Sequence, residues 1–161
     1  MMRAVSMASL TEGSKAYRTI LLGGLSAGVL DLTAALVTSG LRGVKPIRVL
    51  QYIASGLLGA DSFKGGLATA TFGASLHFLI AFVAAAVYYG ASRKLDFMME
   101  QALVAGALYG IAVYLFMNLI VLPLSAVNKP PFTFTSLVTG LIIHMLFVGL
   151  PISLATRLYA K

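Results

Sequence analysis

Four long stretches of mostly apolar residues alternate with shorter polar connectors along the chain. Each stretch holds about 20 residues, and a helix of that length crosses the roughly 30 Å hydrocarbon core of a bilayer. The pattern therefore predicts an all-α, polytopic membrane protein. We expect its four transmembrane helices at residues 19–39, 70–90, 101–124 and 137–159.

The remaining segments are predicted from their polarity and spacing. Residues 1–18 carry three basic side chains and are predicted to be a polar N-terminal tail before a single four-helix domain at 19–161. Over residues 46–59, apolar positions recur at helical spacing and polar positions fall on the other side. This segment is too short to span a bilayer, so we expect a short interfacial helix, with a re-entrant segment as the alternative.

Composition and charge support a membrane location. Hydrophobic residues make up 59% of the chain and charged residues 11%, whereas soluble domains are about one quarter charged. The net charge of +7 arises from basic residues between and beyond the apolar stretches. Lipid headgroups explain such charges better than nucleic acid, so no nucleic-acid partner is expected. A small Lys/Arg excess on the side of the termini predicts that both termini are cytoplasmic.

Glycines recur at matching places in the two halves of the chain. The first and third predicted helices each contain a G-x-x-x-G pair, and the second and fourth each place a glycine four residues before a histidine. This pattern predicts an internal repeat of two helical hairpins with the same sense. Small residues let helices approach closely, and we expect this role for six of them: Gly24, Gly28, Gly73, Gly106, Gly110 and Gly140.

Ionisable residues within the apolar stretches are few, and such residues are costly in a membrane. They are Asp31, His77 and His144, with Asn118 as a neutral polar neighbour. Counting residues from the helix ends places the three ionisable groups at one level, roughly 18–19 Å from the side of the termini, with Asn118 further out. We expect a polar cluster there. Asp31 is either a hydrogen-bonded carboxyl that holds the bundle together or a group that handles protons or cations.

The two histidines allow similar alternatives. Either they form interhelical hydrogen bonds, or His77 and His144 together bind a metal or the two axial positions of a haem. With Asp31 as a third ligand they would just suffice for zinc. The chain has no cysteine and therefore no disulfides or thiolate ligands. No catalytic triad, paired carboxylate set, phosphate-binding loop or metalloprotease helix is recognisable, so we expect no catalytic residues, no enzyme activity and no committed cofactor.

These observations predict a non-enzymatic integral membrane protein whose polar cluster relays protons or a small cation. One alternative is an accessory or structural subunit of a larger membrane complex, and another is a redox subunit with a bis-histidine haem or a metal. The expected partners are the lipid bilayer and either a second copy of the chain or a larger complex, because four helices are few for a transport path.

Several stretches carry a family resemblance. They are RVLQYIASGLLG at 48–59, the following GG, HFLIAFVAAAVYY at 77–89, MNLIVLPLS at 117–125 and HMLFVGLPIS at 144–153. Together they resemble a bacterial family of small four-helix integral membrane proteins, and helix number, polar positions and the late prolines are faintly similar to YagU-type inner-membrane proteins. The resemblance implies a bacterial cytoplasmic membrane and brings no catalytic residues with it.

Overall fold

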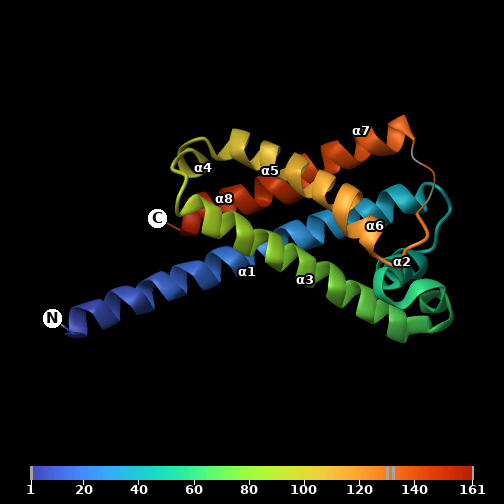
Figure 1. Cartoon of the computed structure of the whole chain (residues 1–161), viewed down its shortest axis with the longest axis horizontal. Helices are drawn as coiled ribbons and strands as arrows, with labels where there is room; N and C mark the ends of the chain where they lie inside the picture. Colours follow the sequence, from blue (N-terminus) through green and yellow to red (C-terminus); the bar gives the residue numbers. More distant parts are fainter. Residues whose placement is uncertain (1, 130, 132, 161) are drawn as a thin grey trace.

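The computed structural model describes residues 2–129, 131 and 133–160, with side chains from residue 12 onward. These residues form four long helical rods packed along one another, with shorter helices at both ends (Figure 1). The first two rods are α1 (Met2–Gly40) and α3 (Gly66–Ser92). The third consists of α5 (Ala102–Phe116), η2 (Met117–Val121) and α6 (Leu122–Leu124), and the fourth of α7 (Phe134–Ile143), η3 (His144–Gly149) and α8 (Leu150–Tyr159).

The predicted all-helical class and the four long apolar helices are confirmed over the part of the chain that the structure describes. Four segments are long and apolar enough to cross a membrane: Glu12–Gly40, Gly66–Ser92, Ala102–Leu124 and Phe134–Tyr159. The first, second and fourth are longer than the predicted helices, and the third begins one residue later than predicted. Both ends of the chain lie at the same end of the bundle, as four spans require (Figure 1).

The N-terminal region differs from the expected polar tail. The α1 helix begins at Met2 and continues without a break to Gly40, so residues 2–18 are helical. Within that part, Glu12 accepts a hydrogen bond from Tyr89 at 3.2 Å and forms a 2.8 Å ion pair with Arg93. These contacts tie the beginning of the first apolar span to the end of α3.

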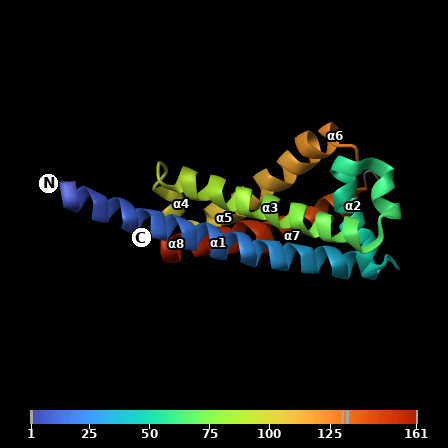
Figure 2. The same ribbon diagram turned by 90° about the horizontal axis from the view of Figure 1, so that it is seen from below.

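The connector between the first two rods folds into α2 (Pro46–Leu58) and η1 (Gly59–Lys64). Pro46 begins α2, where a missing N–H costs nothing, and α2 runs across the end of the bundle rather than along it (Figure 2). Gln51 donates to the Gly66 carbonyl at 3.0 Å, and Ala126 donates its N–H to the Gly56 carbonyl at 2.9 Å. The predicted amphipathic helix is therefore fastened to the bundle on two sides.

Two π-helical segments precede the prolines within the third and fourth rods. Pro123 follows η2 closely, and Pro151 follows η3. A proline ring collides with the carbonyl of the residue four positions earlier in a regular α-helix. Leu119 and Phe147 occupy those positions, and each lies inside a π segment. We attribute the wider turns to this collision, since they let the chain remain helical past each proline.

The first hairpin packs through the G-x-x-x-G pair of α1. A Cβ atom at Gly24 would reach the ring and the backbone of Phe82, and one at Gly28 would lie 2.7 Å from the ring of Phe78. The absence of side chains at Gly24 and Gly28 therefore lets the two phenylalanines of α3 pack closely against α1.

The second hairpin packs through the corresponding pair of α5. A Cβ atom at Gly106 would lie 3.0 Å from the Gly149 carbonyl oxygen, and one at Gly110 would lie 2.6 Å from the Met145 Cα. Here each glycine of α5 lies against the backbone of η3, and the lack of a side chain on the glycine allows that close approach.

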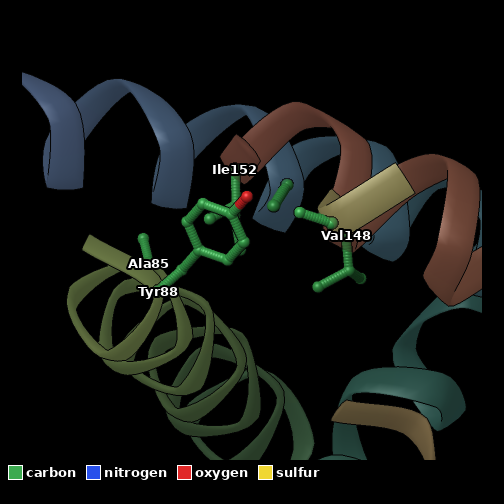
Figure 3. Close-up of a cluster of buried hydrophobic side chains, with 6 residues drawn as sticks. Ala85, Tyr88, Val148 and Ile152 are labelled. Atoms are coloured by element: carbon green, nitrogen blue, oxygen red, sulfur yellow. The ribbon is translucent and has the colours of Figure 1, made fainter. Parts of the chain in front are cut away.

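The tightly packed core lies toward the end of the bundle that holds the termini. The ring of Tyr88 is fully buried between α3 and the fourth rod, next to Ile152 (Figure 3). Its edge also meets Tyr109, with ring centroids 5.0 Å apart. The buried cluster comprises Ala27, Ala85, Tyr88, Ala105, Val148 and Ile152.

Candidate functional site

A partly open cavity of about 300 Å³ lies in the half of the bundle away from the termini. All four rods contribute to its wall, and α2 closes part of it with Tyr52 and Ile53. Asp31, His77 and His144 all line this cavity. The structure thus brings the three ionisable residues of the predicted cluster, which come from three different helices, to the wall of one cavity.

His77 joins two helices through a hydrogen bond. Its Nε2 lies 2.8 Å from the carbonyl oxygen of Gly28 on α1. Because a carbonyl oxygen can only accept, Nε2 carries the hydrogen, and in the neutral ring Nδ1 is then the unprotonated acceptor. The ring also meets Phe78 edge-on, with centroids 5.5 Å apart. This is the interhelical hydrogen bond that we considered from the sequence.

His144 begins the π segment η3 and bonds within its own rod. Its Nδ1 lies 2.9 Å from the Gly140 carbonyl oxygen, one turn earlier. By the same reasoning Nδ1 carries the hydrogen, and Nε2 is left as the acceptor. The ring meets Tyr114 of α5 at 5.2 Å between centroids and 74° between planes. An aromatic contact rather than an interhelical hydrogen bond therefore holds His144.

Asp31 lies on α1 three residues after Gly28, and residues at that spacing share one face of a helix. It is partly buried and lines the same cavity as His77. Among the described residues, no side chain forms an ion pair or a hydrogen bond with its carboxylate. The carboxylate is therefore available to a proton or a ligand in the cavity.

Asn118 lies in η2 and is separate from the cavity lining. Its side-chain amide donates to the Tyr114 carbonyl at 3.0 Å, and Lys129 donates to the Asn118 backbone carbonyl at 2.6 Å. The second bond fastens the connector after α6 to η2. Asn118 stabilises the outer end of the third rod rather than contributing its amide to the cluster.

A zinc site would need three or four ligands in one place. Over the described ranges, no three His, Asp or Glu side chains come together as a metal-binding group. Haem ligation through His77 Nε2 would also break its hydrogen bond to Gly28. The zinc and haem alternatives therefore remain expectations from the sequence.

The two other predicted packing glycines also lie at close contacts. A Cβ atom at Gly73 would collide with the Leu50 carbonyl of α2, and one at Gly140 would collide with the Tyr114 ring. The lack of a side chain at Gly73 thus lets α2, which closes part of the cavity, pack against α3. The lack of a side chain at Gly140 lets the Tyr114 ring, which contacts His144, pack against α7.

Sequence reasoning missed the contribution of α2 to the site. Tyr52 lies in the cavity wall, and burial raises the pKa of its phenol, so the hydroxyl stays neutral and can donate a hydrogen bond. The helical spacing of apolar residues in 46–59 indicated a buried face, but nothing in the sequence indicated what that face covers. Tyr52 lies off that apolar face, so its place in the cavity wall could not be predicted from the sequence.

Searches for relatives leave the family undetermined, because no family model, curated protein or solved structure matches the chain. The fold itself defines a coarser class. The described residues form an all-helical protein with four helices long and apolar enough to span a membrane.

Proposed function

We propose that the chain is a multi-pass protein of the bacterial cytoplasmic membrane in which Asp31, His77 and His144 handle protons or a small cation. The observation that carries this proposal is the single cavity that all three residues line. Each residue has acceptor capacity left over, namely the Asp31 carboxylate, His77 Nδ1 and His144 Nε2. Intramembrane ionisable residues facing such a space typically mark ion or proton pathways.

The arrangement suits one-sided access. The cavity occupies the half of the bundle away from the termini, and Val148 belongs both to its wall and to the buried core. Beyond that point the core is closed by Tyr88 and by Tyr109, whose hydroxyl donates to the Ala84 carbonyl at 2.7 Å. A proton entering the cavity can be taken up by Asp31 or by a neutral histidine, and further passage requires motion of the core or a second copy of the chain.

The internal repeat is part of the proposal and is supported by helix register. The alignment that pairs Gly24 with Gly106 and His77 with His144 also pairs Phe82 with Gly149. Gly24 contacts Phe82 in the first hairpin, and Gly106 contacts Gly149 in the second. The corresponding glycines therefore touch corresponding positions of their partner helices, which is what a duplicated hairpin requires.

Proton flux in proteoliposomes tests the function. Purified protein is reconstituted, a potassium diffusion potential is imposed, and the internal pH is followed with a trapped dye. We expect flux above that of empty vesicles for the wild type and a loss of that excess for Asp31→Asn, because the amide cannot carry a titrating proton. Asp61→Asn is the matched control, since Asp61 is exposed and pairs with Lys64 outside the cavity.

Two results would count against a proton-handling role. One is wild-type flux equal to that of empty vesicles, which would instead favour the structural-subunit alternative. The other is undiminished flux in Asp31→Asn, which would remove Asp31 from the path.

A further inference from the structure

The cavity presents hydrogen-bond acceptors and almost no donors. The protons on His77 Nε2 and His144 Nδ1 are already donated to the carbonyls of Gly28 and Gly140. The Ser125 hydroxyl, also in the lining, donates to the Leu122 carbonyl at 2.8 Å. An ionised carboxylate such as Asp31 accepts only. The Tyr52 hydroxyl is the remaining donor in the described lining.

The charge of the lining has one sign. Asp31 supplies a carboxylate, and the described lining contains neither Lys nor Arg. An anionic ligand would bring further acceptors and further negative charge to this space, so the Asp31 carboxylate and the neutral histidines disfavour carboxylates and phosphates. A ligand with several N–H donors and a positive charge complements both properties.

The rest of the wall is apolar. Fifteen of the twenty lining residues are aliphatic, glycine or methionine, with Ile80, Ala81 and Val113 among them. The volume of about 300 Å³ lies at the lower end of the range for small-molecule sites, which are mostly apolar with a few convergent polar groups. A bare metal ion would leave most of this wall without a partner.

We infer that the cavity binds an organic ammonium: a primary amine, protonated and placed at Asp31, whose compact apolar body fills the space between α2, α3 and α5. The inference rests on the cavity of the proposed function and names its ligand class. Binding requires no flux, so the two ideas can fail separately.

Benzylammonium and benzyl alcohol are suitable probes because they share a shape and differ in charge. Binding is measured by titration calorimetry on the full chain in zwitterionic nanodiscs, and the heat from empty nanodiscs is subtracted. We expect saturable binding of benzylammonium to the wild type. In Asp31→Asn the affinity should fall by about tenfold or more, which is the loss typical of one charge-assisted hydrogen bond. Asp61→Asn should match the wild type, and benzyl alcohol should bind weakly and equally to all three proteins.

A second variant tests the inference without relying on correct folding of Asp31→Asn. Val113→Phe places a ring in the cavity and leaves Asp31 unchanged, so it should abolish benzylammonium binding. Wild-type affinity in that variant would show that the amine binds elsewhere. The inference is also overturned if benzylammonium gives no heat above empty nanodiscs, if Asp31→Asn binds it as tightly as the wild type, or if the alcohol binds as tightly as the ammonium.

Discussion

Replacing Gly110 by Ala should separate the two helices of the second hairpin. A Cβ atom there would lie 2.6 Å from the Met145 Cα and 2.7 Å from the His144 carbonyl carbon. Both are backbone atoms, so no change of side-chain rotamer relieves the contact. Either α5 or the beginning of η3 must move, and the position of the His144 ring in the cavity moves with it.

The expected cost follows from two opposing effects. Overpacking a well-packed contact costs about 1–3 kcal/mol, and a backbone-on-backbone collision belongs at the upper end of that range. Alanine recovers up to about 1 kcal/mol relative to glycine through its higher helix propensity. We therefore expect Gly110→Ala to lower the free energy of unfolding by about 2 kcal/mol.

The assay is reversible unfolding in mixed micelles, followed by circular dichroism. Gly90→Ala is the matched control, because Gly90 lies within α3 and a Cβ atom there has no heavy atom within 4 Å. The control should be about 0.5–1 kcal/mol more stable than the wild type. Equal stability of the Gly110→Ala and Gly90→Ala variants would refute the packing at this contact.

Two further predictions concern the end of the bundle near the termini. Thr19 is 1% exposed, and its hydroxyl has no hydrogen-bond partner among the described residues. Thr19→Val should therefore raise the free energy of unfolding by about 1 kcal/mol. A lower free energy of unfolding in this variant would show that the hydroxyl has a hydrogen-bond partner. Glu12→Gln removes the partly exposed ion pair with Arg93 and should cost about 1 kcal/mol or less. That cost should shrink at high salt, and a salt-independent loss would contradict an ionic origin.

The number and type of the long helices could be predicted from the sequence. The residue at which the first helix begins could not, because the prediction began at residue 19 and α1 begins at Met2. Hydropathy locates the apolar part of a helix, and the polar residues before residue 19 indicated only that the chain leaves the apolar layer. Residues 2–18 contain no proline and only one glycine, Gly13. Nothing in that segment therefore stops the helix from starting at Met2.

Counting residues along the helices predicted that the three ionisable residues lie near one another, but it could not foresee the cavity that all three line. Its shape depends on how α2 crosses the bundle, and that depends on the contact between Gly73 and the Leu50 carbonyl. The π segments were also missed. The positions of Pro123 and Pro151 are evident in the sequence, but a proline can end a helix, kink it or widen a turn, and the linear pattern does not say which occurs.

The central claim is that Asp31, His77 and His144 line one cavity. The chain has two histidines, so nitrogen NMR of protein labelled with ¹⁵N-histidine gives two imidazole spectra. At neutral pH we predict one Nε2–H ring, His77, and one Nδ1–H ring, His144. At a fixed pH, Asp31→Asn should move the ¹⁵N resonances of both rings, and Asp61→Asn should move neither. Two rings whose resonances are unchanged by Asp31→Asn would contradict the shared cavity.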